Sequence, residues 1–358
     1  MIYRLALKIR HLFYDKGWCK QQTCKVPTVC VGNITVGGTG KTPHTELIIK
    51  TLLKSNEWCY KDIAVLSRGY RRKSKGFQNV PIDGTAYEYG DEPLQIKHKF
   101  PDITVAVDKD RVEGCGFLCD PETLQTSKKA VKCLDKRIPD IDLVILDDAF
   151  QYRKLKCGVN IVLVDYNRPI FEDRLLPFGS LRDLPERLKY ADIVIVTKCP
   201  NYLQDEEREE WRSKLGVTEK QHLFFTTISY CTPTVVYPEC DPRYIYSKKL
   251  VLFSGIANDT LLRNYLCDTY HIVKRFIFAD HYRYTYSDIQ KITAALKKNP
   301  TSAIATTEKD AQRVRDVRNV PMAFKERLFQ VPIEVGFYSF EEREEFEKTL
   351  ISAINESI

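Results

Sequence analysis

The sequence predicts an α/β fold in which a doubly wound, mostly parallel sheet is followed by a second, smaller α/β domain. Short apolar runs rich in β-branched residues recur along the chain, and helix-compatible segments separate them. Such near-continuous apolar strands are typical of a parallel sheet covered by helices on both faces. With 358 residues, the chain is long enough for a sizeable core divided between two domains.

Six strand candidates define the first domain, which we place at residues 1–225. They span residues 28–33, 62–67, 103–108, 141–147, 159–165 and 191–197. Because helical segments separate them, we expect crossover connections between the strands, and therefore parallel pairing within one sheet.

A second series of strands predicts a smaller domain at residues 226–358. Its strand candidates span residues 249–256, 272–278 and 302–307. Two further candidates flank this series, at 222–229 with a continuation to Tyr237 and at 327–335. We expect these two to pair as a two-stranded connection between the domains. The charged helix expected at about 339–356 is assigned to this second domain, although its composition is compatible with packing on either one.

The composition is that of an ordinary globular protein, with 43% hydrophobic and 29% charged residues. No apolar stretch of about 18 residues occurs, so we expect no membrane-spanning helix. Arg4, Lys8 and Arg10 interrupt the apolar N-terminus, which argues against a secretory signal and favours the cytoplasm.

The 12 cysteines contain no CxxC pair, and we expect reduced thiols. The net charge of +7 suggests an anionic partner without choosing among nucleic acid, lipid and phosphorylated substrates.

A glycine-rich turn follows the first strand, where residues 32–43 read GNITVGGTGKTP. Backbone N–H groups of such a loop and of the following helix cradle phosphate oxygens, which predicts a P-loop. Lys41 would reach the β- and γ-phosphates, and the Thr42 hydroxyl would ligate Mg²⁺. The nucleotide-binding candidates are Thr35, Val36, Gly37, Gly38, Thr39, Gly40, Lys41 and Thr42. Thr35 departs from the generic GxxxxGK[ST] pattern, which has glycine there.

Two acidic residues close the strand at 141–147. Asp147 and Asp148 follow four apolar residues. In P-loop folds, a strand beside the phosphate loop delivers an Asp to the Mg²⁺ ion. This pattern is weak alone, because many strands end in Asp, but beside a phosphate loop it predicts a metal-binding pair.

If the phosphate loop serves phosphoryl transfer to an alcohol, a further group is needed that accepts or orients the hydroxyl proton. The candidates are Asp91 and His281, which stand in the segments GDEP and DHY. Asp91 could instead be an ordinary helix N-cap, and a single His is more often a surface or core residue than a catalyst. The spacing leaves both interpretations open.

Arginines cluster in residues 67–73 and 174–183, and arginine suits bidentate phosphate binding. Arg68 and Arg182 each lie close to a turn-forming glycine, which favours them as ligand-binding residues. The basic run at 71–73 is equally compatible with a solvated surface loop.

The first 16 residues predict a basic amphipathic helix. Its apolar face comprises Ile2, Leu5, Ala6, Ile9, Leu12 and Phe13, whereas Arg4, Lys8, Arg10 and His11 lie mostly elsewhere. Such a helix is suited to an anionic membrane interface. The alternative is that the apolar face packs on the core of the protein.

Taken together, the motifs resemble the tetraacyldisaccharide 4′-kinase family of lipid A biosynthesis. The matching stretches, in the order of the family, are VGNITVGGTGKTP, LSRGY, GDEP, DKDR, LDDAFQ, RLLPFGSLRD, ADIVIVTK, SGIAND, DHYRYT and TTEKD. The resemblance implies transfer of the γ-phosphate of ATP, with Mg²⁺, to the 4′-hydroxyl of a tetraacylated glucosamine disaccharide 1-phosphate. It also implies a peripheral enzyme on the cytoplasmic face of the inner membrane, with no nucleic acid and no obligate protein partner.

The resemblance also assigns roles residue by residue. Asp147, Asp148 and Thr42 match the positions of the metal site, and Lys41 that of the ATP phosphates. Asp91 matches the family's proposed base, and His281 matches the partner that orients or tunes it. The other positions matching the active site are Arg68, Tyr70, Glu92, Arg111 and Arg182, of which Arg182 is a catalytic candidate. Ala149, Tyr152 and Asp183 depart from the family pattern, so the resemblance assigns no role to Tyr152 or Asp183.

Two other function classes remain compatible with parts of the sequence. Thr197 and Lys198 resemble a guanine-reading loop, as in a P-loop GTPase or metallochaperone switch, but Pro200 stands where that loop has Asp. A non-enzymatic lipid- or nucleic-acid-binding protein fits the charge and the N-terminal helix. It leaves the phosphate loop and the acid pair unexplained.

Overall fold

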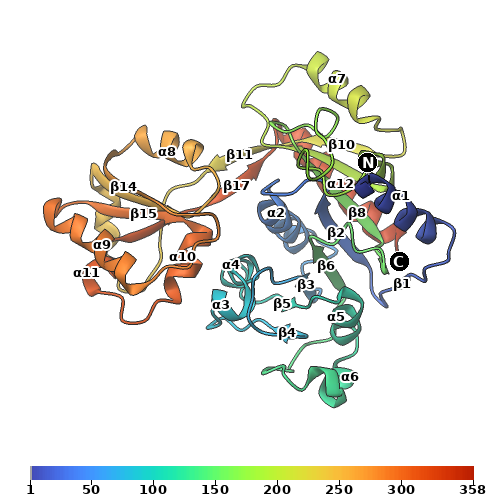
Figure 1. Ribbon diagram of the computed structural model, residues 1–358, viewed down its shortest axis with the longest axis horizontal. Coiled ribbons are helices and arrows are strands. Elements are labelled where there is room, and N and C mark those ends of the chain that lie inside the picture. Colours follow the sequence, from blue (N-terminus) through green and yellow to red (C-terminus); the bar gives the residue numbers. More distant parts are fainter. Residues whose placement is uncertain (1) are drawn as a thin grey trace.

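The computed structural model describes residues 2–358 and contains a large sheet, a small sheet and a narrow connector between them (Figure 1). The large sheet has the strand order β10-β9-β8-β2-β6-β3-β5-β4, and all its neighbours are parallel except β4 and β5. Its strands are β2 (Thr28–Asn33), β3 (Ile63–Ser67), β4 (Gln78–Asn79), β5 (Thr104–Val107), β6 (Leu143–Asp147), β8 (Val159–Asp165), β9 (Ile193–Thr197) and β10 (His222–Phe225). The predicted α/β architecture is confirmed.

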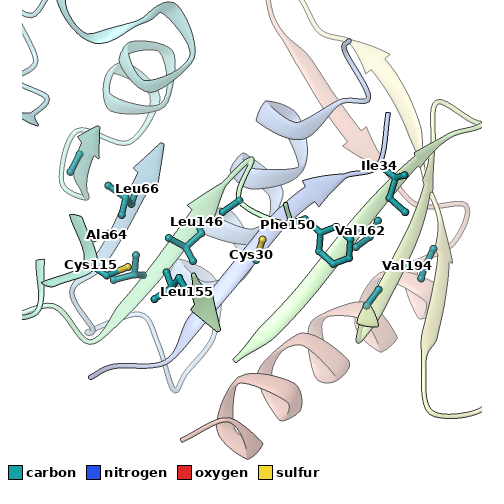
Figure 2. Packing of buried hydrophobic residues seen from close by; sticks show 14 of the residues in the cluster. Cys30, Ile34, Ala64, Leu66, Cys115, Leu146, Phe150, Leu155, Val162 and Val194 are labelled. Atoms are coloured by element: carbon teal, nitrogen blue, oxygen red, sulfur yellow. The ribbon is translucent and has the colours of Figure 1, made fainter. Parts of the chain in front are cut away.

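Helices cover both faces of the large sheet, so it is doubly wound. Successive residues of β2 point to opposite faces: Val29 and Val31 join one buried cluster and Cys30 joins the other. The face carrying Cys30 is shown in Figure 2, where the buried side chains spread across several strands and Phe150 lies between Cys30 and Val162. The helices and short strands of this part are α2 (Lys41–Lys54), α3 (Ala86–Tyr89), α4 (Asp91–Lys99), α5 (Arg111–Leu118), α6 (Pro121–Thr126), α7 (Asp205–Leu215), β1 (Gln22–Thr23) and β7 (Leu155–Lys156).

The second sheet has five strands in the order β12-β16-β15-β13-β14. Its strands are β12 (Thr234–Val235), β13 (Lys249–Ser254), β14 (His271–Ile277), β15 (Ala303–Thr307) and β16 (Leu328–Val331). Its helices are α8 (Thr260–Cys267), α9 (Tyr286–Lys298), α10 (Glu308–Arg315) and α11 (Met322–Lys325). This unit is the predicted smaller α/β domain.

The connector is a two-stranded antiparallel ribbon. Strand β11 (Thr227–Tyr230) pairs with β17 (Ile333–Gly336), and Thr227 lies opposite Gly336. The predicted pairing is therefore confirmed for this part of the two segments only, because residues 222–225 form β10 of the large sheet and residues 328–331 form β16 of the small one. Figure 1 shows the ribbon joining the two sheets.

The C-terminal helix α12 (Phe340–Glu356) returns to the large sheet. Phe346, Leu350 and Ile354 are fully buried in the same cluster as Val29, and the ring of Phe346 meets that of Phe224 edge-on at 5.3 Å. These three residues follow the i, i+4, i+8 spacing of one helix face. The assignment of this helix to the smaller domain was therefore wrong, whereas the division of the chain at residues 225 and 226 stays a prediction.

The N-terminal helix α1 (Ile2–Asp15) docks through the face opposite its apolar one. Leu7 and His11 are its buried residues, and His11 Nε2 lies 2.6 Å from Asp183 Oδ1. The Tyr3 hydroxyl donates to the carbonyl of Arg182 at 2.8 Å. The predicted apolar face is exposed along its length, from Ile2 to Phe13, so it does not pack on the core.

All 12 cysteines of the chain are free thiols, as the sequence predicts. Within residues 2–358, no helix combines the length and the apolar character that crossing a membrane requires.

Candidate active site

The phosphate loop joins the end of β2 to the start of α2. Gly37 and Gly40 adopt φ values of 92° and 87°, which glycine adopts without steric cost. Two buried side chains brace the loop from below: Asn33 Nδ2 donates to Thr39 Oγ1 at 2.8 Å, and Thr197 Oγ1 donates to the Thr39 carbonyl at 2.9 Å. Helix α2 begins at Lys41, so its N-terminus faces the loop, as an anion-binding site requires.

Thr35 explains how the loop departs from the generic pattern. It is 2% exposed and forms an antiparallel bridge with Leu181, while the next residue, Val36, donates its N–H to Ser180 O at 2.8 Å. The position usually held by glycine is thus used to pair the loop with the segment 174–183. That pairing brings Arg182 to the loop.

Lys198, which directly follows strand β9, contacts the loop. Its ammonium group donates to the carbonyl of Gly38 and lies 2.6 Å from Asp165 Oδ2. Lys198 also has a positive φ of 58°, which is uncommon for a non-glycine residue and frequent at functional sites. In this structure Lys198 braces the phosphate loop.

The acid pair stands at the end of β6, next to the loop. Ser67 Oγ donates to Asp147 Oδ2 at 3.2 Å, and Asp147 Oδ1 is buried without a hydrogen-bond partner. Burial, with the charges of Glu92 and Asp148, raises the pKa of Asp147 to about 7. A buried carboxylate oxygen without a partner is costly, which indicates that the site is completed by a ligand.

Asp148 faces the cationic side of the site. Its Oδ1 lies 3.8 Å from Lys41 Nζ, and the Arg182 guanidinium donates to both carboxylate oxygens. Burial alone would raise its pKa, but Lys41 and Arg182 outweigh burial and lower it to about 2. Arg111, the first residue of α5, donates to the backbone carbonyl of Asp148 at 3.2 Å. Asp148 has a φ of 55°, and these contacts hold that unfavourable conformation in place.

Asp91 and His281 come together from the two domains. Asp91 is the first residue of α4, is 8% exposed, and its Oδ2 lies 3.4 Å from His281 Nδ1. The N-cap position belongs to Gly90, and Asp91 Oδ1 accepts only from the N–H of its neighbour Glu92 at 3.1 Å. The N-cap interpretation of Asp91 is therefore wrong. The ring of Tyr70 meets His281 edge-on at 5.5 Å between centroids.

Comparison with known proteins decides the family. Residues 1–355 match the family described as LpxK, tetraacyldisaccharide-1-P 4′-kinase. The chain belongs to this family. A tetraacyldisaccharide 4′-kinase of Parabacteroides distasonis is 38% identical over 365 residues, covering 100% of this chain and 93% of that protein. One from Cytophaga hutchinsonii is 39% identical over 348 residues, covering 95% and 90%.

The fold agrees with a solved member of the LpxK family. The crystal structure of LpxK from Aquifex aeolicus in complex with ATP matches with a TM-score of 0.71 at 26% identity, covering 99% of this chain and 96% of that one. The resemblance inferred from the motifs is thus confirmed, and the chain is a lipid A 4′-kinase that uses ATP. The GTPase switch and the non-enzymatic binding protein are excluded as its primary function.

The site residues predicted from the LpxK motifs fall into two groups. Lys41, Asp147, Asp148, Arg182 and Arg111 surround the end of the phosphate loop, as the distances above describe. Asp91, His281, Tyr70 and Glu92 form the second group, at the contact between α4 and the smaller domain. Arg68 is exposed, and its side chain takes part in none of the hydrogen bonds or ion pairs that the structure describes between residues 2 and 358.

Two departures from the LpxK pattern have structural roles. Asp183 is fully buried and pairs with His11, so it anchors helix α1. The Tyr152 hydroxyl donates to Asp110 Oδ1 at 2.6 Å, and Asp110 is the N-cap of α5. The Arg111 guanidinium lies 5.4 Å from the centre of the Tyr152 ring. Tyr152 therefore helps to fix Arg111 against Asp148.

Sequence reasoning missed several residues of the site. Ser67 stands in the matched stretch LSRGY, and Lys309 in the matched stretch TTEKD, but neither received a role. Lys309 Nζ pairs with Glu92, and Arg313, one turn further along α10, pairs with Asp91. The signal available was the spacing of one helical turn between Lys309, inside the TTEKD stretch, and Arg313, just after it.

Proposed function

We propose that the protein phosphorylates the 4′-hydroxyl of a tetraacylated glucosamine disaccharide 1-phosphate with ATP and Mg²⁺, and that the two residue groups described above divide the work. The observation that carries the proposal is the meeting of the phosphate loop, Lys41 and the Asp147–Asp148 pair within one site. Phosphoryl transfer requires mainly positioning and charge neutralisation, and these residues supply both.

In this proposal the nucleotide phosphates lie against the loop from Thr35 to Thr42. Backbone N–H groups of Gly37, Gly38 and Gly40 bind the phosphate oxygens, and Lys41 neutralises the β- and γ-phosphates. Arg182 stabilises the charge of the transferred group from the other side.

The residues present fit a magnesium ion. Oxygen ligands are available from the Thr42 hydroxyl, from the unpartnered Oδ1 of Asp147 and from Asp148. Between residues 2 and 358, no cluster of three or more His, Cys, Asp or Glu side chains could hold a metal ion. Mg²⁺ is typically bound by one or two carboxylates plus substrate phosphates and waters, and Asp147 and Asp148 would supply the carboxylates. When bound, the ion would neutralise the charge on the phosphates.

The second group would receive the sugar. Asp91 would accept or orient the proton of the acceptor hydroxyl, which is a poor nucleophile until that proton is accepted. His281 would fix the orientation of Asp91 from the other domain, and Tyr70, Glu92, Arg68 and Arg111 would line the substrate. Since Asp91 and His281 belong to different domains, the contact between domains would complete the site and exclude water.

A coupled assay tests this assignment. Purified protein is incubated with ATP and Mg²⁺, with and without the tetraacyldisaccharide 1-phosphate, and ADP is measured. We expect ADP formation to depend on the lipid and to fall at least about 10²-fold in Lys41→Ala. Lys54→Ala, an exposed lysine at the other end of the same helix, serves as the matched control. Lipid-independent hydrolysis, or full activity in Lys41→Ala, would contradict the proposal.

We further propose that the protein acts at the cytoplasmic face of the inner membrane through helix α1. The exposed fractions of Ile2, Leu5 and Leu12 are 86%, 58% and 47%, and the opposite face of the helix is occupied by its docking contacts. An apolar helix face with basic residues beside it favours an anionic lipid interface.

Vesicle flotation tests the membrane assignment. We expect Leu5→Glu combined with Ile9→Glu to abolish binding to vesicles containing phosphatidylglycerol. The control variant combines Leu134→Glu with Leu261→Glu, two exposed leucines elsewhere, and should float like the unmodified protein. Equal flotation of both variants would exclude α1 as the membrane contact. A cytoplasmic location without nucleic-acid or obligate protein partners stays a prediction.

A further inference from the structure

Arg313 is the residue that joins Asp91 to His281. It belongs to α10 of the smaller domain and is 8% exposed. Its Nε lies 3.0 Å from Asp91 Oδ2, and its Nη2 donates to the same oxygen. Nη2 also lies 3.2 Å from His281 Nδ1, closer than the 3.4 Å between Nδ1 and Asp91 Oδ2. The carboxylate and the imidazole thus meet through a guanidinium.

Hydrogen-bond accounting determines the state of His281 in this arrangement. A guanidinium only donates, so Nδ1 of His281 is the acceptor when it bonds to Arg313. The proton of the neutral ring then lies on Nε2, whose nearest carboxylate is Asp280 Oδ2 at 3.9 Å. In the other tautomer, an N–H on Nδ1 would point at the N–H of Arg313.

Arg313 is itself fixed from behind by Asp310, which is fully buried. Asp310 Oδ1 accepts from Arg313 Nη1 at 2.9 Å and from the Tyr284 hydroxyl at 3.0 Å. Arg313 Nη1 also donates to Gly255 O at 3.1 Å, and the same carbonyl accepts the backbone N–H of His281 at 3.2 Å. Arg313 and the backbone of His281 therefore share one anchor, which gives the guanidinium little freedom.

Asp91 keeps one oxygen available despite these contacts. Both bonds from Arg313 go to Oδ2, whereas Oδ1 accepts only the N–H of Glu92. Each carboxylate oxygen has about two lone-pair sites, so Oδ1 retains capacity for a substrate hydroxyl. The guanidinium orients the carboxylate without occupying the oxygen that would receive the proton.

We propose that Arg313 is a positioning residue for phosphoryl transfer: it turns Oδ1 of Asp91 toward the acceptor hydroxyl, selects the Nε2–H tautomer of His281 and joins the two domains at this point. The inference rests on the proposed role of Asp91. It concerns how that residue is held, and so extends the assignment of the base and its partner.

The charges around Asp91 support this role. Lys309 and Arg313 face Asp91 from α10, and His281 faces it from the loop after β14. Glu92 is the next residue of α4, and its charge is neutralised by Lys309. Asp310 faces Arg313 from the other side. Burial would raise the pKa of Asp91, but the charges of Arg313 and Lys309 and the hydrogen bonds from Arg313 outweigh burial and lower that pKa well below its usual range. Without Arg313, burial has less opposition and the pKa of Asp91 rises.

Loss of the Arg313 guanidinium makes the activity more sensitive to acid. A base must be ionised, so activity falls when the pH drops through the pKa of Asp91. In the unmodified protein that loss lies below the working range. Replacing the guanidinium with a neutral side chain moves the acid limb of kcat/KM to higher pH.

The experiment compares Arg313→Met, Arg313→Lys and the control Arg315→Met in the full-length protein. Arg315 lies on the same helix, where it donates to Val236 O at 2.7 Å and does not touch Asp91. We expect Arg313→Met to lower kcat about 10²-fold or more, to change KM for ATP little, and to shift the acid limb upward by about one pH unit or more. Arg313→Lys should recover part of kcat, and Arg315→Met should resemble the unmodified protein. Unchanged kcat and pH profile in Arg313→Met would overturn the proposal, as would a rise in kcat.

A second measurement does not depend on the stability of any Arg313 variant. Nitrogen-15 NMR of the unmodified protein, with the His281 resonances assigned by their loss in His281→Gln, reports the tautomer. We expect an unprotonated Nδ1, and a protonated Nδ1 in the neutral ring would overturn the inference. Full activity of Asp91→Ala would refute the proposed base, whereas an inactive Asp91→Ala beside a fully active Arg313→Met would refute the role of Arg313 alone.

Discussion

The substitution Gly32→Ala tests how the sheet positions the acid pair. Gly32 lies in β2, and a Cβ added there would lie 2.5 Å from Phe150 Cβ and 3.1 Å from Phe150 N. Phe150 belongs to the segment that follows Asp148 and is buried in the core shown in Figure 2. The backbone at Phe150 must therefore move, and Asp148 is two residues away.

The magnitude follows from these contacts. Overpacking a closed core costs about 1–3 kcal/mol, which corresponds to a decrease in Tm of a few degrees for a domain of this size. Asp148 already has a positive φ, so the segment has little freedom to relax. A displacement of about 1 Å at a positioned group costs about 10²-fold in turnover. We expect Gly32→Ala to lose turnover well beyond any loss of folded protein.

Thermal denaturation and turnover measured on the same preparation check this prediction. The control is Gly116→Ala, in the exposed part of α5, where an added Cβ meets nothing within 4 Å. Alanine is favoured over glycine inside a helix by roughly 0.5–1 kcal/mol, so the control should be at least as stable as the unmodified protein. Wild-type Tm and turnover in Gly32→Ala would refute the argument.

Three further predictions follow from other contacts. Asp91→Ala and His281→Ala should each lower kcat about 10²–10⁴-fold. The double variant should be little less active than the poorer single variant, because residues acting as a unit give non-additive losses. If steady-state kinetics showed that the two losses multiply, this prediction would be contradicted. His11→Ala should leave buried Asp183 without its imidazole partner and weaken docking of α1 by about 1–3 kcal/mol. Tryptic cleavage within that helix should therefore become faster, and an unchanged cleavage rate would contradict the docking. Burial lowers the pKa of His44 to about 4, so the unfolded chain binds more protons between about pH 6.5 and 4. The free energy of unfolding should therefore fall by up to roughly 3 kcal/mol as the pH drops through that window, and denaturant unfolding of His44→Gln should lack this part of the decrease.

The strands could be predicted from the sequence because parallel strands buried on both faces leave continuous apolar runs. The segments 28–33 and 159–165 coincide with β2 and β8, since each run ends where a loop begins. The phosphate loop was equally predictable, because its geometry requires glycine and lysine at fixed spacing. The presence of Thr35 at the position where the generic pattern has glycine is explained only by the bridge to Leu181 in the structure.

Features that depend on tertiary packing could not be predicted in this way. Helix α12 carries an apolar stripe that either domain could have buried, and only its contact with Phe224 and its place in the same buried cluster as Val29 assign it to the large sheet. The only local signal for Arg313 is its helical spacing from Lys309, and this spacing does not assign a role, since an arginine in a charged helix usually faces solvent. Its role arises because α10 lies against α4 (Figure 1).

The central claim is that this chain transfers phosphate from ATP to the 4′ position of the lipid. The most direct test is to incubate the purified protein with ATP, Mg²⁺ and tetraacyldisaccharide 1-phosphate and to locate the new phosphate by phosphorus–proton correlation NMR of the product. We expect a second phosphate coupled to the proton at the 4′ carbon, formed by the unmodified protein and by Lys54→Ala but not by Lys41→Ala. A phosphate at any other carbon, or no lipid product beside ATP hydrolysis, would contradict the account.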